Sequence, residues 1–361
     1  MSFDVEVENR TPFSAVTHVQ HDADGQEVLV AMFSASFEAP ERDGRLDIAA
    51  AQLPVVLGDV PRGVPGVSSN RYDADIAPRK PASEIVVNGT AYTPKDRPAR
   101  EMQVGFRVNG LQKVLHVVGD RIYDAGAYSE PLPFRTMPII YERAFGGMTA
   151  AAADAENPVG VGFRHAVSAD PSVRTHAPNI TYPDQMFRGP QDRPRAAGFG
   201  PIGRNWRQRL QYAGTYDQAW IDNQWPLPPK DFDPRHHMST PPDQHLPRIV
   251  GGEDVRLIGL TPSGCWDFRM PRVIAPIRLL FADRVEERDF VADTAIIEPD
   301  LWRVTLKSRI ALVTRRNAPA LRAIVFGQVT PALLVAKRKR KQYFSHYGGD
   351  GTLRDRPMWQ P

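Results

Sequence analysis

Six carboxylate and imidazole side chains crowd into one short stretch of the sequence, DFDPRHHMSTPPDQH. They are Asp231, Asp233, His236, His237, Asp243 and His245. Histidine and carboxylate groups are ligands that zinc and non-haem metals take in proteins. In an extended strand, Asp231 and Asp233 would also point to the same side, as paired ligands or catalytic carboxylates do. A metal-dependent hydrolase built on this cluster is therefore one hypothesis for the chain.

The same stretch also fits an ordinary loop. Its spacing matches no established zinc-ligand pattern, and prolines at positions 234, 241 and 242 break any helix that could align the ligands. Aspartates near prolines and turns commonly accept hydrogen bonds from nearby backbone N–H groups. We expect loop-forming side chains here, with no metal, no cofactor and no catalytic residue.

Other catalytic patterns are weaker. Cys265 lies between Gly264 and Trp266 in an apparent strand, where a free cysteine is expected to be a small buried hydrophobe and not a nucleophile. The sequence has no G-x-S-x-G, H-E-x-x-H or Walker-type motif. The glycines of GFGPIGRNW follow a loop rich in proline and arginine, not the strand that a dinucleotide site requires. We expect that the chain is not an enzyme.

Recognition by aromatic and basic side chains is the main alternative to catalysis. Residues 198–245 hold Trp206, Trp220 and Trp225, and tryptophan is enriched in binding hot spots. Trp206 and Trp225 are candidate partner contacts, whereas Trp220 is expected in the core. Because Trp225 lies between Gln224 and Pro226, we expect it to be the most exposed of the three. A carbohydrate-binding module that stacks sugars on Trp225 is a further alternative.

Two charged motifs complete the set of candidates. In YERAFGG, Arg143 either pairs with Glu142 beneath a turn at Gly146-Gly147 or anchors a partner at the surface. Near the end of the chain, five cations are consecutive: Lys337, Arg338, Lys339, Arg340 and Lys341. This run either binds an acidic partner or forms a solvated helix face that complements the helix dipole.

The elements that must position these residues are predicted to be strands. Residues 28–37 form a mostly apolar run of β-branched and aromatic residues, and residues 294–297, 302–314 and 321–329 also have strand character. Residues 101–118 alternate around Asn109-Gly110, which predicts a hairpin with a type I′ turn. The expected fold class is mainly β, an antiparallel β-sandwich-like domain.

The middle of the chain differs from these strands. Residues 131–247 contain half of the 34 prolines and show little periodicity, so we expect a long irregular insertion. A helix is predicted to begin at Pro331 with Thr330 as its N-cap and to continue through the basic run. The expected organisation is one β domain over residues 1–330, followed by a basic helix and tail over residues 331–361.

Composition narrows the functional classes. The 361 residues are 42% hydrophobic and 24% charged, and the net charge of +3 is too small to indicate a nucleic-acid partner. The single cysteine fits a reducing compartment. The first residues, MSFDVEVENR, have no apolar signal core, and no run is long enough to span a bilayer. A cytoplasmic protein without membrane insertion is expected.

A series of short motifs occurs in a fixed order along the chain. They are NRTPF (residues 9–13), YDAD (72–75), GTAYTP (89–94), YERAFGG (141–147), NPVGVGF (157–163), GFGPI (198–202), GTYDQAW (214–220), DFD (231–233) and GGE (251–253). With these motifs the chain resembles, over roughly residues 5–330, the bacterial family of unknown function numbered 2169. Ser239 and Thr240 stand where that pattern has a smaller, more apolar pair.

The resemblance implies a function in protein assembly. Members of that family are similar to adaptors or chaperones of type VI secretion systems, which bind a toxic effector, keep it soluble and help to mount it on the spike complex. This implies a non-enzymatic chain whose partners are an effector protein and the spike. The central loops and their aromatic and arginine side chains would then make the contacts.

Overall fold

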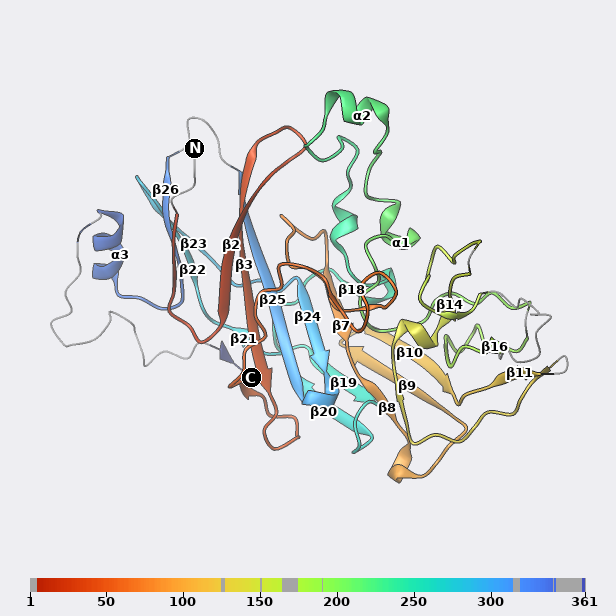
Figure 1. The fold of residues 1–361 in the computed structure, drawn as a ribbon. Coiled ribbons are helices and arrows are strands. Elements are labelled where there is room, and N and C mark those ends of the chain that lie inside the picture. Colours follow the sequence, from red (N-terminus) through yellow and green to blue (C-terminus); the bar gives the residue numbers. More distant parts are fainter. Residues whose placement is uncertain are drawn as a thin grey trace.

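The computed structural model describes residues 5–124, 127–149, 151–163, 175–189, 191–313, 319–339, 341 and 359–360. Strands dominate this part of the chain, and its helices are few and short (Figure 1). The predicted mainly β class is therefore confirmed. No helix in these residues has the length and apolar character that a membrane crossing needs.

The central sheet has seven strands. Their order is β18 (His245–Leu246), β7 (Ser83–Val87), β24 (Thr294–Glu298), β25 (Arg303–Val313), β3 (Glu27–Glu38) and β2 (Ser14–His21), with β4 (Asp47–Ile48) also paired to β3. Neighbouring strands are antiparallel except β7 and β24. Ten consecutive residues of β3 are buried, which explains why its sequence is a continuous apolar run and not an alternation.

A four-stranded sheet packs against this central sheet. Its order is β1 (Glu6–Asn9), β26 (Leu321–Phe326), β22 (Ile277–Phe281) and β23 (Val285–Arg288). Phe33 of β3 and Phe326 of β26 approach with ring centroids 4.7 Å apart. Contacts of this kind between inner faces form the core of a sandwich, so the sandwich-like expectation also holds.

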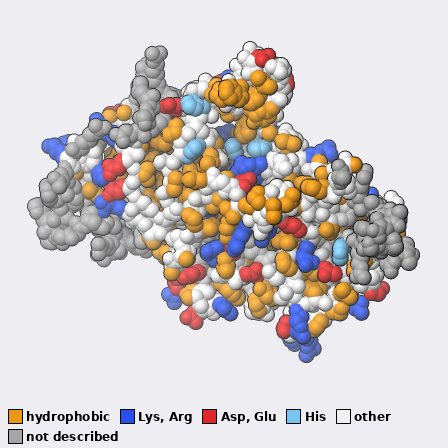
Figure 2. Space-filling model, in the orientation of Figure 1, with side chains coloured by type: hydrophobic (Ala, Val, Ile, Leu, Met, Phe, Trp, Pro, Cys, Tyr) orange, Lys and Arg blue, Asp and Glu red, His pale blue; other side chains and the backbone are white. Residues whose placement is uncertain are grey.

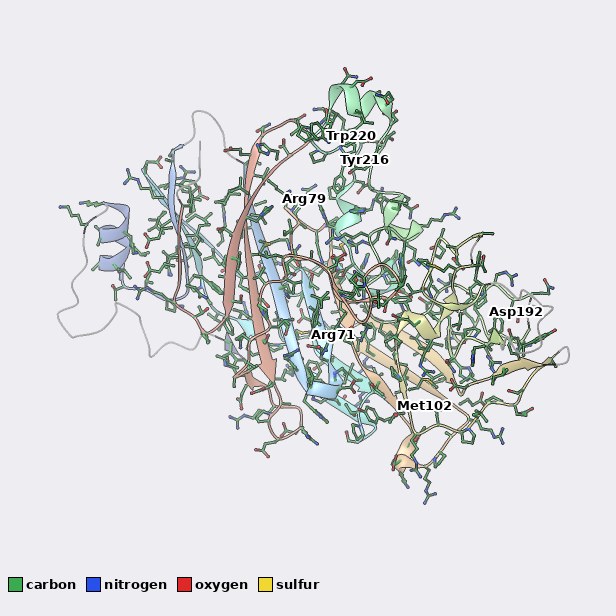
Figure 3. The ribbon with its side chains drawn as sticks, in the orientation of Figure 1. Arg71, Arg79, Met102, Asp192, Tyr216 and Trp220 are labelled. Atoms are coloured by element: carbon green, nitrogen blue, oxygen red, sulfur yellow. The ribbon has the colours of Figure 1, made fainter. Side chains whose placement is uncertain are left out.

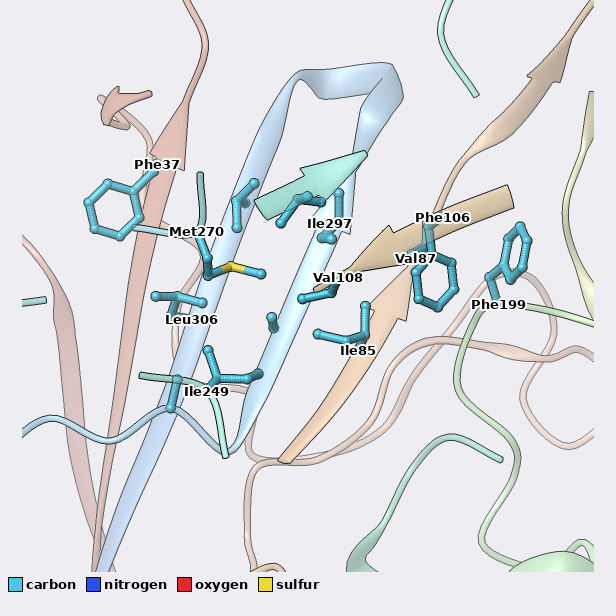
Figure 4. Packing of buried hydrophobic residues seen from close by; sticks show 14 of the residues in the cluster. Phe37, Ile85, Val87, Phe106, Val108, Phe199, Ile249, Met270, Ile297 and Leu306 are labelled. Atoms are coloured by element: carbon cyan, nitrogen blue, oxygen red, sulfur yellow. The ribbon is translucent and has the colours of Figure 1, made fainter. Parts of the chain in front are cut away.

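A five-stranded sheet continues this core, on the same face of the central sheet as the four-stranded sheet. Its order is β17 (Ile180–Thr181), β10 (Leu111–Val118), β9 (Glu101–Val108), β19 (Asp254–Ile258) and β20 (Cys265–Arg269). The predicted hairpin is present as β9 and β10. Asn109 has a φ of 49°, but Gly110 does not share this left-handed conformation, so the type I′ turn was wrong. Figure 4 shows how Phe106 and Val108 of β9 meet Ile85 and Val87 of β7 in one hydrophobic core.

The proline-rich insertion is largely irregular, as predicted. Its described elements are β13 (Thr136–Pro138), η2 (Tyr141–Arg143), β14 (Phe145–Gly146), β15 (Val161–Gly162), β16 (Thr175–His176), β17, α1 (Arg207–Leu210), α2 (Gln218–Asn223), η3 (Pro234–His237), η4 (Pro242–Gln244) and β18. Only β17 and β18 join the larger sheets, so side chains must fix most of the insertion to the scaffold.

Short elements connect the rest. They are β5 (Val60–Pro61), β6 (Asn70–Tyr72), β8 (Thr90–Tyr92), η1 (Pro94–Asp96), β11 (Ile122–Asp124), β12 (Ala127–Tyr128), β21 (Arg272–Val273), η5 (Pro299–Leu301) and β27 (Trp359–Gln360). Helix α3 (Pro331–Arg338) begins where predicted, and the Thr330 hydroxyl accepts a hydrogen bond from the Leu333 amide at 3.3 Å. The helix ends at Arg338, so it does not continue through the basic run. The proposed division at residue 330 stays a prediction.

Candidate partner-binding surface

The insertion is fixed to the central sheet by a buried carboxylate. Glu84 on β7 is fully buried and forms an ion pair with Lys80. It also accepts hydrogen bonds from the amides of Ser239 and Thr240 at 2.7 and 2.9 Å, and from their hydroxyls at 2.8 and 3.0 Å. Burial alone would raise the pKa of this carboxyl, but the Lys80 charge and these hydrogen bonds lower it. The polar pair at 239–240 is therefore structural.

A second ionic cluster holds α1. Arg209 is 1% exposed, and it donates to Asp73 and to the Ile202 carbonyl at 2.9 Å each. Arg204 reaches the other oxygen of Asp73 at 2.9 Å. Burial opposes the charge of Asp73, yet the two arginines bring its pKa down to about 2. Asp73 thus remains ionised as the common anchor of both arginines.

A third cluster connects the insertion to β10. The ammonium group of Lys113 lies 2.9 Å from Asp243 and 2.7 Å from the Gln244 side-chain oxygen. The Tyr182 hydroxyl donates to the other Asp243 oxygen at 2.8 Å. Burial lowers the pKa of Lys113 to about 8, against the opposing effect of Asp243. We call residues 234–246 the insertion base. The first and third clusters bind it to the scaffold directly, and the second does so through Arg209, which also donates to the His236 carbonyl at 3.0 Å.

The structure does not bring the six predicted metal ligands together. Asp231 accepts hydrogen bonds from Thr215, and Asp233 caps η3 and pairs with Arg235. Asp243 belongs to the Lys113 cluster, and a ring nitrogen of His245 meets the Thr240 carbonyl at 2.9 Å.

His236 and His237 pack on Phe232, with ring centroids 5.6 and 5.1 Å away. Burial, with help from nearby cations, lowers the pKa of His237 to about 3. Within the described residues, no three His, Cys, Asp or Glu side chains are placed to share a metal ion. These polar side chains hold loops together, as the loop interpretation expected.

Two other candidate residues, Trp206 and Arg143, make contacts within the chain. Trp206 is 3% exposed and packs edge-on against Tyr141 at 5.1 Å, so as a surface contact it was wrong. Arg143 donates to Asp120 and Asn179 at 3.1 Å each, whereas its neighbour Glu142 accepts from Ser69 at 2.7 and 2.8 Å; the predicted pair between them was also wrong.

Two further predictions, for the glycines after Arg143 and for the cysteine, hold in part. Gly146 and Gly147 have φ values of 145° and 122°, and an added Cβ would lie 2.1 Å from the Asn157 carbonyl oxygen or 2.6 Å from that of Gly160, so both positions need residues without a side chain. Gly146 ends strand β14, however, so the predicted turn was wrong. Cys265 lies in strand β20 as expected, but it is exposed and not buried, because it points to the outer face of the five-stranded sheet.

The basic run is only partly within the described residues. Lys337 pairs with Glu6 and Glu8 at 2.5 and 2.7 Å, so it joins α3 to β1. Lys339 and Lys341 are exposed, and nothing is described of the Arg338 side chain or of Arg340. As partner contacts, these residues stay a prediction.

One segment of the insertion stands out from the body of the protein. Residues 214–230, which we call the α2 projection, rise beyond the sheets in Figure 1. The Asp217 carboxylate caps α2 by accepting from the Trp220 amide at 2.9 Å. The Trp220 indole donates to the Leu227 carbonyl at 3.0 Å, and its ring packs edge-on against Tyr216 at 4.7 Å. Trp220 is therefore half-buried within the projection, not in the core as predicted.

The tip of the β2–β3 hairpin supports the projection. Gln224 donates to the Ala23 carbonyl at 2.7 Å, and Lys230 pairs with Asp24 at 2.7 Å. Leu227 lies against Gly25, where an added Cβ would be 3.3 Å from its methyl group. These contacts hold the projection in one orientation relative to the central sheet.

Three large side chains of the α2 projection are exposed to solvent. Trp225 is 66% exposed, Tyr216 56% and Ile221 53%, so the predicted exposure of Trp225 is confirmed. Figure 2 shows hydrophobic side chains gathered on this protrusion, and Figure 3 places Tyr216 and Trp220 beside each other there. Exposed aromatic groups on a rigid support have the features of a binding hot spot.

Sequence reasoning found only part of this surface. Trp225 was a candidate, but Tyr216 and Ile221 were not. The signal was available in GTYDQAWIDNQW: an N-cap aspartate, Asp217, begins a helix of six residues whose apolar side chains exceed what so short a helix can bury.

Comparison with known proteins identifies the family. The sequence profile of a bacterial family, described as "Uncharacterized protein conserved in bacteria (DUF2169)", matches residues 24–309. The chain belongs to this family. The match covers the whole insertion and most of the central sheet, but not β2 or the last residues of β25. No curated protein and no solved structure matches the chain.

Proposed function

We propose that this protein is a non-enzymatic adaptor or chaperone that binds a type VI secretion effector through the α2 projection and presents it to the spike complex. The observation that carries the proposal is the exposure of Trp225, Tyr216 and Ile221 on a segment whose backbone is held by the β2–β3 tip. The role in secretion comes from the family resemblance, and the surface comes from this geometry.

A rigid support favours binding because little conformational entropy is lost on association. The capping bond of Asp217, the indole bond of Trp220 and the ion pair of Lys230 all exist before any partner arrives. Tryptophan and tyrosine present a large contact area with few rotatable bonds. The free energy gained by burying these aromatic side chains would therefore contribute directly to the affinity for the partner.

The chemistry of the projection also describes the partner. Asp217 and Asp222 are exposed on the same short helix as Ile221. An effector surface that fits would have an apolar pocket with lysine or arginine at its rim. Adaptor bound in excess would stabilise the folded effector by mass action, by about 2.7 kcal/mol at a concentration 100 times the Kd.

The test is co-expression with the product of the neighbouring effector gene, followed by affinity capture and thermal melting of the effector. We expect co-purification with the unaltered adaptor and a higher effector melting temperature. The Ile221→Ala variant should weaken capture, whereas Ile258→Ala should not, because Ile258 has nearly the same exposure, 54% against 53%, but lies on β19. An effector that never co-purifies and melts at the same temperature without the adaptor contradicts the proposal.

A further inference from the structure

The outer edge of the central sheet is open at β2. The eight residues of β2 pair with β3 along their whole length, and β2 is the last strand in the sheet order (Figure 1). Among the described residues, no other strand and no other backbone group bonds to the backbone on its far side, although the Val55 amide donates to the Ser14 hydroxyl at 3.2 Å. An unpaired strand of this length is a template for pairing with another chain.

The hydrogen-bond pattern shows which residues face outward. The Asp22 amide donates to the carbonyl of Gln26, its register partner, so that pair is a hydrogen-bonded one. Because such pairs alternate along an antiparallel ladder, even-numbered residues of β2 bond to β3 and odd-numbered residues point their N–H and C=O groups away. The bond from the Ala39 amide to the Trp302 carbonyl, on the opposite side of β3, agrees with this alternation. The residues whose backbone N–H and C=O groups point outward are therefore Ala15, Thr17, Val19 and His21.

Other edges of the larger sheets are protected. β1 carries Glu6 and Glu8, and β23 has the sequence VEER. β17 and β18 are only two residues long. β20 contains Asp267 and Arg269, and the segment before β4 covers it, since the Trp266 indole donates to the Asp43 carbonyl at 2.7 Å. Charges, short strands and covering loops are the usual ways in which proteins prevent edge pairing.

In the part of the chain that the structure describes, β2 has none of these protections. Its sequence, SAVTHVQH, contains no Asp, Glu, Lys, Arg or Pro, and its register with β3 has no bulge. The strand is therefore self-complementary, since two copies would oppose no permanently charged side chains. An antiparallel register centred on His18 places Thr17 opposite Val19 and Ala15 opposite His21, so all four outward residues are used.

We propose that a second copy of this chain pairs with β2, forming a two-fold dimer in which the central sheets of both copies become continuous. The occupant is a second copy because an uncharged, self-complementary edge needs no other sequence to complete it. The inference does not depend on effector binding, since it rests on backbone groups of β2 and not on the exposed side chains of the α2 projection.

The test is the mass of the purified full-length protein by sedimentation velocity and light scattering over a wide concentration range. The unaltered chain should sediment as two copies at micromolar concentration. Thr17→Pro should give single chains, because it removes an outward N–H and no bond to β3. Val19→Lys should do the same by adding a charge to the edge. Circular dichroism would verify that both variants remain folded.

The matched control is Val285→Lys. Val285 is 38% exposed on the charged edge β23 and Val19 is 39% exposed on β2, so the two substitutions differ only in their edge. The control should remain a dimer. A single chain at every concentration without any substitution overturns the proposal, as does a dimer that survives both Thr17→Pro and Val19→Lys, or one that Val285→Lys dissociates equally.

Discussion

The base and the projection of the insertion use side chains in opposite ways. The side chains that hold the base, Glu84, Asp73 and Lys113, are buried, and their polar atoms are bonded within the chain. At the projection, polar groups such as Asp217 fix the backbone while Trp225 and Ile221 face solvent. The comparison teaches that the polar cluster near residues 231–245, which first suggests chemistry, is scaffold, and that the apolar groups beside it are the candidates for binding.

The largest expected effect concerns stability at the base. Glu84→Ala should reduce the free energy of unfolding by about 3–5 kcal/mol, because it leaves the Lys80 charge and the Ser239–Thr240 donors buried without their acceptor. Urea unfolding measures this loss. Asp267→Ala is the control, since Asp267 pairs with Arg256 on an exposed face and should cost less than about 1 kcal/mol. Equal losses in both variants would remove the distinction between base and surface.

The opposite pattern is expected at the projection. Trp225→Ala should weaken effector binding by about 2 kcal/mol, roughly 30-fold, since a central exposed tryptophan acts as a hot spot. The same variant should change the free energy of unfolding by less than about 0.5 kcal/mol, because its side chain contributes little to the core. Calorimetric titration tests the predicted change in affinity, and urea unfolding tests the predicted change in stability. Unaltered affinity together with a large loss of stability would reverse the assignment.

The third prediction concerns the stability of the insertion base at low pH, which depends on His237. The folded state holds the pKa of His237 at about 3, below its ordinary value of 6.5, so the unfolded chain binds the proton more readily. The contribution of this group to the free energy of unfolding is complete above pH 6.5 and is lost as the pH falls toward 3. At pH 4 the loss is about 2 kcal/mol after allowance for partial exposure. Fluorescence-monitored acid titration of His237→Phe should therefore show unfolding at a lower pH than in the unaltered protein.

His176→Phe is the control for this titration, since His176 is exposed on β16. It should leave the midpoint unchanged. A shift of the same size in both variants would mean that burial of His237 is not the cause.

The smallest effect concerns the helix of the projection. Asp217→Ala should weaken α2 by about 1 kcal/mol, because the Trp220 amide loses its capping acceptor. Amide exchange should accelerate over residues 218–223 and remain unchanged at the insertion base. Asp222→Ala, which removes only a bond with Gln218, should accelerate it less. Faster exchange at the base as well would show that the two regions unfold together.

Local sequence signals predicted much of the scaffold. The β9–β10 hairpin, the buried run of β3 and the Thr330 cap were readable because each depends on residues close together in the chain. Glu84 and Ser239 are 155 positions apart, and no local pattern shows that one would satisfy the other. Trp206 was placed at the surface for the same reason, since its contact with Tyr141 exists only after folding.

Hydrogen exchange of this protein with and without the proposed effector tests the central claim most directly. The account predicts slower exchange over residues 214–227 when the effector binds, while the insertion base, already protected by its buried ion pairs, changes little. An effector that binds and slows exchange elsewhere, with residues 214–227 unchanged, would contradict it.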